Sequence, residues 1–177
     1  IFAQCYKRKE NIMSSKYSSL QKQLYGPPQN KPWVWMTTEM LYSDAWQSMS
    51  INCRRLIDFL LIEHRNHAGR ENGHLIATYN QLEKFGLTRS KIKLAIREAE
   101  FLGFIKFKRG AFLSEIRKPN RYKLTFFADK EGGYPTNDWK KITKDNVQQR
   151  HRQLKKQEEI KKNFRKEFRK SVIDIAL

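Results

Sequence analysis

Residues 78–109 read TYNQLEKFGLTRSKIKLAIREAEFLGFIKFKR, and the spacing of their apolar residues changes along the stretch. Apolar residues first recur with helical spacing, are interrupted at Gly86, recur with helical spacing up to Leu102, and then alternate with basic residues. Spacing of three to four residues indicates a helix, and strict alternation indicates a half-buried strand. The stretch therefore predicts a helix, a tight glycine-containing turn, a second helix and a strand.

Capping residues mark the ends of both predicted helices. Thr78 and Gln81 have the spacing of a capping box, which predicts the start of the first helix. Gly86 can adopt the left-handed conformation that ends this helix, and Thr88 can cap the second one. The helical spacing predicts two core-facing residues on the first helix, Leu82 and Phe85.

The second helix, residues 88–102, has an apolar face and a basic face. Its helical periodicity places five residues on one stripe that must be buried: Ile92, Ala95, Ile96, Ala99 and Leu102. Arg97 lies on the opposite face and can bind guanine through two hydrogen bonds, while Leu94 or the methyl group of Thr88 can contact a thymine methyl group. The alternative is a basic face that contacts only solvent. The predicted DNA contacts on this helix are Thr88, Arg89, Ser90, Lys91, Lys93, Leu94 and Arg97.

Two alternating strands follow within residues 104–127, and the basic loop between them makes the pair typical of a wing. In the first strand the inward residues are Ile105 and Phe107, and the outward residues are Lys106 and Lys108. In the second strand the inward residues are Tyr122, Leu124 and Phe126, and the outward residues are Arg121, Lys123 and Thr125.

The outward residues of both strands are mostly cationic, and like charges that face each other across strands are destabilising. Such a face is better tolerated where an anion neutralises it. We therefore expect the basic helix face and the outward strand faces to form one continuous positive surface, with Lys93 and Arg97 beside Lys106 and Lys108. The predicted DNA contacts on the wing are Lys106, Lys108, Arg109, Arg117, Lys118, Arg121 and Lys123.

The charge of the whole chain points to a polyanionic partner. Its 177 residues include 36 Lys and Arg against 18 Asp and Glu, for a net charge of +18. Residues 86–123 alone hold eleven basic and three acidic residues. A bias of this size exceeds what solubility requires and is typical of a protein that binds nucleic acid.

The segments before residue 78 predict an arm and further helices. Residues 1–31 form a basic flexible arm that ends in GPPQNKP, and we expect translation to begin at Met13, so that residues 1–12 would not be native. The aromatic-rich stretch 33–48 predicts two short helices whose rings cap a small core or, alternatively, form a platform for bases. Ser50 caps a longer helix that Gly69 ends, with a buried face of Cys53, Leu56, Ile57, Leu60, Leu61 and His64.

Residues 33–141 resemble the winged helix-turn-helix proteins of bacterial mobile elements, above all replication-initiator-type and phage regulatory proteins of alphaproteobacteria. The matching stretches are SDAWQSMSINCRRLIDFL, ENGHLIATYNQLEKFGLTRSKIKLAIREAEFLGFIKF, RYKLTFF and YPTNDWKK. The resemblance covers about 60% of the chain. It implies a mainly α fold with a small β-sheet, a domain over residues 32–141, sequence-specific binding of duplex DNA, and no intrinsic catalysis.

The remaining residues, 142–177, predict a long basic amphipathic helix, because they contain no Pro or Gly and repeat apolar residues about every four positions. Three interpretations stay open: a docked or solvated helix that adds nonspecific DNA affinity, a helix that forms a homodimer, and a tail that folds on binding. Phe101 is expected to pack against this tail or against the N-terminal aromatic residues.

The sequence offers no basis for predicting an enzyme, a cofactor or a metal site. It lacks a P-loop and a dinucleotide-binding fingerprint, and His64 and His67 have no third ligand at a suitable spacing. Two cysteines and no long apolar run favour a cytoplasmic, nucleoid-associated protein without membrane contact. The leading hypothesis is a transcription regulator or replication initiator; the alternatives are an RNA- or ribosome-associated protein and an adaptor for an acidic protein.

Overall fold

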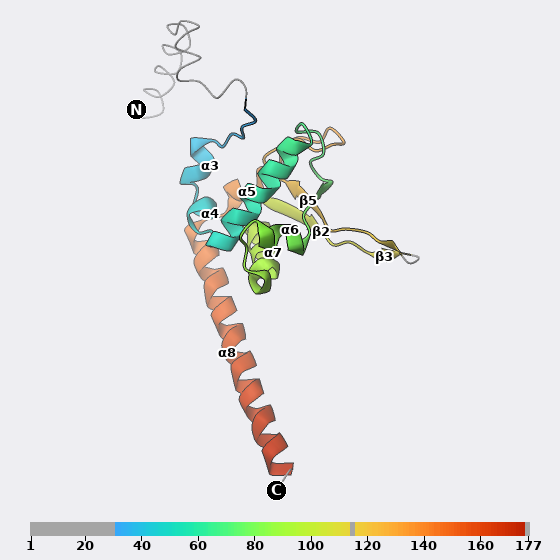
Figure 1. Cartoon of the computed structure of the whole chain (residues 1–177). Coiled ribbons are helices and arrows are strands. Elements are labelled where there is room, and N and C mark those ends of the chain that lie inside the picture. Colours follow the sequence, from blue (N-terminus) through green and yellow to red (C-terminus); the bar gives the residue numbers. More distant parts are fainter. Residues whose placement is uncertain (1–30, 114–115, 176–177) are drawn as a thin grey trace, which may run out of the picture. The chain divides into compact units, whose positions relative to one another are not determined.

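The structure, a computed structural model, describes residues 31–113 and 116–175. The chain divides into two units, Ile1–Trp35 and Met36–Leu177. The predicted N-terminal arm lies outside the described residues except for Lys31. The second unit is mainly helical with a small three-stranded antiparallel sheet (Figure 1), as expected for the broad fold class.

Three helices, each capped by a Ser or Thr side chain, begin the second unit. Helix α3 (Thr38–Tyr42) and helix α4 (Asp44–Gln47) confirm the two short helices predicted there. Helix α5 (Ile51–Asn66) begins at Ser50, whose Oγ accepts a hydrogen bond from the backbone nitrogen of Cys53. The six residues predicted to face the core from α5 are all buried. The aromatic stretch is divided: Trp46 is buried in the core, whereas Trp33, Trp35 and Tyr42 are exposed.

Helix α6 (Tyr79–Lys84) and helix α7 (Ile92–Phe101) form the predicted helix pair, joined by a turn and a 3₁₀ helix, η1 (Arg89–Lys91). The capping box of Thr78 and Gln81 is present, and Gly86 ends α6 with a φ of +100°. The five apolar residues of the predicted stripe are all buried, which confirms the face that α7 turns to the core.

Two predictions about this helix pair are wrong. Thr88 precedes η1 but makes no capping hydrogen bond with its side chain; instead its backbone nitrogen donates to Asn52 Oδ1 at 3.1 Å. Phe85 follows the last residue of α6 and remains 38% exposed, with its ring edge-on to Phe59. Phe85 lies beyond the last residue of α6, where helical periodicity no longer determines the direction of a side chain, and Thr88 is followed by η1 because α7 begins only at Ile92.

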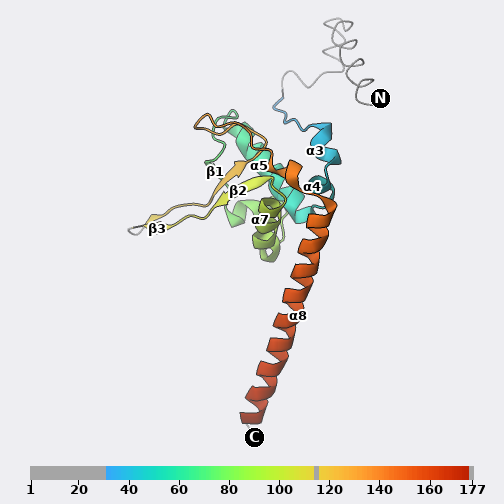
Figure 2. The same cartoon turned by 180° about the vertical axis from the view of Figure 1, so that it is seen from behind.

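The sheet consists of strands β1 (Leu75–Ile76), β2 (Ile105–Lys108) and β5 (Arg121–Leu124), in the order β1-β5-β2. Beyond the sheet, β3 (Phe112–Leu113) pairs with β4 (Ile116–Arg117), where the sequence predicted only a loop. We call residues 105–124 the hairpin; Figures 1 and 2 show that its β3 end extends away from the helices. Helix α7 contacts β2 and α5 contacts β1.

The alternation predicted for the strands is confirmed up to Leu124. Ile105, Tyr122 and Leu124 are buried, while Lys106 and Lys108 are exposed. Thr125 was expected to point outward, but it is fully buried and its hydroxyl group donates to the carbonyl oxygen of Gly103 at 2.7 Å. The regular strand ends at Leu124, so the alternation stops one residue before Thr125.

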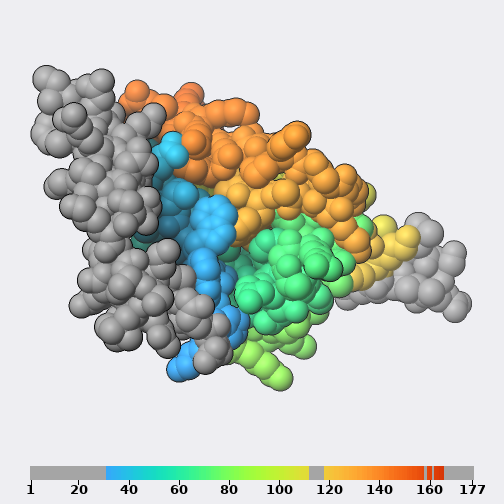
Figure 3. Space-filling model, turned by 90° about the horizontal axis from the view of Figure 1, so that it is seen from above, coloured from blue at the N-terminus to red at the C-terminus, as the bar shows by residue number. Residues whose placement is uncertain are grey.

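A buried asparagine ties the turn after α5 to the end of β5. Asn72 is 0% exposed; its Oδ1 accepts from the backbone nitrogen of Leu124 at 2.7 Å, and its Nδ2 donates to the carbonyl oxygen of Leu124 at 2.8 Å. Residue 72 also accepts a backbone hydrogen bond from Lys130. In Figure 3 the orange segment near residue 130 lies against the green part of the chain that contains this turn.

We expect Asn72→Ala to lower the free energy of unfolding by about 1–3 kcal/mol, because it leaves buried backbone groups of β5 without partners. Chemical denaturation of both proteins measures the difference. Asn66→Ala, at an exposed position, is the matched control and should change stability by less than about 0.5 kcal/mol. Equal stability of the two variants would contradict the role assigned to Asn72.

Helix α8 (Lys144–Ile175) follows a short 3₁₀ helix, η2 (Asp138–Lys141), and confirms the long C-terminal helix. Its first turns contact α4: Val147 is buried, and the backbone nitrogen of Lys144 donates to Asp44 Oδ2 at 3.1 Å. Arg150 lies over the ring of Phe101, which confirms that Phe101 packs against this helix. Apolar residues farther along α8 are exposed: Leu154, Ile160 and Phe164.

No helix in the described part of the chain combines the length and the apolar character that crossing a membrane requires.

Candidate nucleic-acid interface

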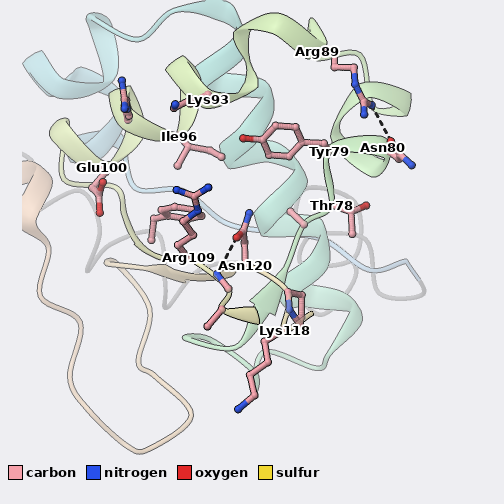
Figure 4. A pocket seen from close by; sticks show the side chains of 16 residues that line it. Thr78, Tyr79, Asn80, Arg89, Lys93, Ile96, Glu100, Arg109, Lys118 and Asn120 are labelled. Carbon is pink, nitrogen blue, oxygen red and sulfur yellow. Dashed lines mark hydrogen bonds between the residues drawn. The ribbon is translucent and has the colours of Figure 1, made fainter. Parts of the chain in front are cut away.

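A groove with a volume of about 950 Å³ lies between α7 and the base of the hairpin (Figure 4). Its walls come from three parts of the chain: the start of α6, one face of α7, and residues on both sides of the hairpin. Its basic lining residues are Arg89, Lys93, Arg97, Arg109 and Lys118. All five belong to the DNA contacts predicted from the sequence.

Lys93 and Arg97 form the α7 wall of the groove. They are four residues apart, so they lie on one face of the helix, and both are exposed. The buried residues Ile92, Ala95 and Ala99 hold the opposite side of α7 in the core. Within residues 31–113 and 116–175, no carboxylate forms an ion pair with Lys93 or Arg97. Both cations are therefore available to an external anion.

Arg109 and Lys118 form the hairpin wall. The backbone between them bends where the nitrogen of Gly110 donates to Asn120 Oδ1 at 3.0 Å and the nitrogen of Lys118 donates to the carbonyl oxygen of Ala111 at 3.0 Å. A Cβ atom at residue 110 would lie 1.9 Å from the carbonyl oxygen of Lys118, so the close approach of the two chains requires glycine. Neither Arg109 nor Lys118 has an ion-pair partner in the described part of the chain.

Acidic groups reduce the positive charge in two places. Arg89 Nη1 lies 2.8 Å from Glu83 Oε2 and donates to Asn80 Oδ1 at 2.8 Å, so this cation is already paired within the protein. Glu100 lines the groove as well and would repel a phosphate that lay close to it. The positive potential is therefore expected to be strongest near the unpaired cations Lys93, Arg97, Arg109 and Lys118.

Helix α5 positions the turn between α6 and α7. Asn52 accepts from the backbone nitrogen of Thr88, and the Arg55 guanidinium group donates to the carbonyl oxygen of Gly86. Glu98 of α7 accepts from both the backbone nitrogen and the hydroxyl group of Ser50, each at 2.6 Å. These contacts fix the start and the middle of α7 relative to the buried helix beneath it.

The structure does not bring the strand lysines together with the α7 face, contrary to our expectation. The register pairs Lys106 with Lys123 and Lys108 with Arg121, so these four cations share one face of the sheet. Phe107 faces the other way and lines the groove. We call the face of the sheet that carries these four cations the outer sheet face. Successive side chains of a strand point to opposite faces, so the outer sheet face is turned away from Phe107 and from α7.

Two of the four cations of the outer sheet face have an acidic partner within the protein. Lys106 Nζ lies 3.5 Å from Asp138 Oδ2, but the other oxygen of this carboxylate lies 2.7 Å from Lys141 Nζ, and Lys123 forms an ion pair with Asp129. The hydrogen bond from Lys123 lowers the pKa of the Asp129 carboxyl group below its usual value, so this carboxylate stays charged at neutral pH. Lys108 and Arg121 form no ion pair with the residues that the structure describes. Asp129 and, in part, Asp138 therefore relieve the repulsion between Lys106 and Lys123, which weakens the sequence-based reason for expecting DNA on this face.

The other predicted contacts are distributed around the start of α7. Thr88, Ser90, Lys91 and Leu94 are exposed there but do not line the groove, and Leu94 is 50% exposed. The backbone of Arg117 lies in β4, and the position of its side chain lies outside the described residues.

Sequence reasoning missed several polar and aromatic residues of the groove, including Tyr79, Asn80, Asn120 and Glu100. Asn80 at the start of α6 accepts a hydrogen bond from Arg89, and no local pattern predicts this contact between the start of α6 and η1. Asn120 lines the groove because of the bend at Gly110, which no local pattern predicts.

No group of three or more His, Cys, Asp and Glu side chains in the described ranges is arranged to hold a metal ion. His67 Nε2 lies 3.2 Å from Glu63 Oε1, and the ring of His64 packs against Phe127. Burial lowers the pKa of His64, as expected for a histidine in an apolar environment. These contacts account for the histidine pair through packing and helix-surface pairing.

Comparisons with protein-family models, curated proteins and solved structures gave no match to this chain.

Proposed function

We propose that residues 32–141 contain a winged helix-turn-helix domain that binds double-stranded DNA in a sequence-specific manner. In this proposal, α6 and α7 are the helix-turn-helix, α7 lies in the major groove, and the hairpin is the wing that contacts the DNA backbone. The order of helix, turn, helix and hairpin supports the proposal, and so does the packing of α5 and α7 against the sheet.

One observation carries the proposal: four unpaired cations from two separate segments meet in one groove. Lys93 and Arg97 come from α7, and Arg109 and Lys118 come from the hairpin. Cations gathered in this way repel each other, and phosphate groups would remove that repulsion while releasing counterions. Arg97 is the residue best suited to read a base, because a guanidinium group can bind guanine through two hydrogen bonds.

The biological role that we propose is transcription regulation or initiation of replication for a plasmid- or phage-like element. This role rests on the resemblance of residues 33–141 to such proteins. A homodimer formed through the exposed apolar residues of α8 would fit a DNA site with two half-sites, although both copies of α8 are strongly basic.

The proposal predicts that Arg97→Ala loses base preference. Selection from a pool of random duplexes should yield one enriched sequence with the wild-type protein. On that sequence the variant should bind about 1–3 kcal/mol more weakly, and it should tolerate substitutions at the position that Arg97 reads. Binding isotherms on the selected duplex and on its single-base variants measure both effects.

Arg70→Ala removes one exposed arginine away from the groove and is the charge-matched control. It should leave both the selected sequence and the affinity unchanged.

Competition with RNA of equal length tests the alternative function, that of an RNA- or ribosome-associated protein. Duplex DNA should displace RNA from the protein at about 150 mM salt. A wild-type protein that enriches no sequence, or that prefers structured RNA, would rule out the proposed function.

A further inference from the structure

Part of the groove, which we call its floor, is lined by aromatic and apolar residues, and contact with the outside of a duplex does not require such residues. Tyr79 of α6 and Phe107 of β2 line it together with Ile96 of α7. Both aromatic side chains are partly exposed, and Figure 4 shows the ring of Tyr79 beside Ile96 in the opening. Partly exposed rings below a row of cations are typical of sites that stack unpaired bases while the cations hold the backbone.

Contacts beneath the floor keep these rings in place. Tyr79 is the first residue of α6, directly after the capping box, and it packs against the core. The ring of Phe107 lies 5.2 Å from the ring of Tyr122, which is fully buried. The stacking surface is therefore supported from below, and a base bound there would meet rings that need not move.

The polar groups around the floor suit a nucleotide. Asn80 Oδ1 accepts from Arg89, which leaves the amide nitrogen of Asn80 without a partner among the described residues. That nitrogen can donate to the edge of a base. Lys93, Arg109 and Lys118 supply unpaired charges for phosphates, and Glu100 disfavours phosphate at its own position.

We infer that the groove binds a single-stranded DNA segment next to a duplex, with bases stacked on Tyr79 and Phe107. The inference rests on the proposed function and specifies its substrate as DNA that is partly unpaired. Bases inside an intact duplex are stacked on their neighbours, so their faces cannot reach a protein ring unless the strand opens. A groove of about 950 Å³ whose lining includes partly exposed rings can hold an opened strand beside the duplex that α7 contacts.

Tyr79→Leu tests the inference, because leucine keeps an apolar side chain at the start of α6 but removes the ring. The probes are a blunt duplex, the same duplex extended by a single-stranded thymine tract, and the thymine tract alone. Wild-type protein should bind the extended probe more tightly than the blunt one. Tyr79→Leu should weaken binding of the extended probe by roughly 5- to 150-fold, the range for loss of one stacked base, and should weaken binding of the blunt duplex much less, so that the preference for the extended probe is lost.

Tyr79→Phe is the matched control, because it keeps the ring and loses only the hydroxyl group. It should bind both probes like the wild type. A fluorescent aminopurine placed in the single-stranded tract reports stacking directly: its emission should fall on binding to the wild type and to Tyr79→Phe, but not to Tyr79→Leu.

The outcomes distinguish the inference from the proposed function. Equal wild-type affinity for both probes, without a change in aminopurine emission, overturns the inference and leaves duplex recognition standing. Equal losses on both probes for Tyr79→Leu also overturn it, because they assign Tyr79 a structural role. Failure of the wild type to bind the blunt duplex, with strong binding of the thymine tract alone, overturns the proposed function and supports stacking in the groove.

Discussion

Gly103→Ala is expected to destabilise the protein by about 2–5 kcal/mol, the sum of a backbone strain of about 1–2 kcal/mol and an overpacking cost of about 1–3 kcal/mol. The strain arises because Gly103 ends α7 with a φ of +73°. The overpacking arises because a Cβ atom there would lie 2.6 Å from the carbonyl carbon of Asp138 and 2.6 Å from the backbone nitrogen of Trp139. Both contacts are with backbone atoms, which cannot turn aside as a side chain can.

The consequence extends beyond one residue, because the segment at Asp138 helps to close the core. Trp139 is 4% exposed and its ring stacks on that of Phe104, with the ring centres 6.1 Å apart. Moving this segment to accommodate a methyl group would separate the two rings. Chemical denaturation should therefore give a lower midpoint for Gly103→Ala.

Gly132→Ala is the matched control, because Gly132 also has a positive φ, +85°, but a Cβ atom there would meet nothing within 4 Å. It should cost only the backbone strain, about 1–2 kcal/mol. If the two variants were equally stable, the close packing of Asp138 and Trp139 against the end of α7 would be contradicted.

The sequence predicted most elements of the second unit because their signals are local. Caps such as Ser50 and Thr78 act on backbone groups within three residues, so their partners are visible in the sequence. The buried stripe of α7 follows from helical geometry alone. Predictions failed where a regular element ends, as at Phe85 and Thr125, because periodicity no longer applies there.

The main error in the candidate site concerned the direction of the strand residues. Alternation correctly separated Phe107 from Lys106 and Lys108, but α7 packs on the side of Phe107. Lys106 and Lys108 therefore lie on the face of the sheet opposite α7. The alternation in the sequence is enough to predict this once α7 is placed against the inward-facing residues of the strand.

Two other features of the site could not be predicted from the sequence. Arg109 and Lys118 line the groove because the hairpin bends at Gly110, and this bend depends on contacts between the two sides of the hairpin. The acids that pair with the outer sheet face are Asp129 in the loop after β5 and Asp138 at the start of η2, and tertiary packing sets the positions of both. Neither feature leaves a local pattern.

Removing three groove cations should cause the largest loss of DNA binding of any variant considered. The groove variant replaces Lys93, Arg97 and Lys118 with alanine. If Lys93 and Lys118 each neutralise a phosphate while Arg97 reads a base, the dependence of log K on log salt should become shallower by about 1.8. Arg97 alone accounts for roughly a 5- to 150-fold loss of affinity, and the two lysines add to it.

A sheet variant of equal charge separates the groove from general electrostatic attraction. It replaces Lys106, Lys108 and Arg121 with alanine, so both variants lose three positive charges. All six residues are exposed, so each substitution should change stability by less than about 0.5 kcal/mol. Any difference in DNA binding between the two variants therefore reflects where the removed charges lie, and not a difference in net charge or in folding.

The most direct measurement is the salt dependence of duplex binding for the wild type and these two variants, on one duplex and over one range of salt. We expect the groove variant to show a much shallower slope and a large loss of affinity, while the sheet variant stays close to the wild type. Equal changes in both variants, or a larger change in the sheet variant, would contradict the assignment of DNA binding to the groove between α7 and the hairpin.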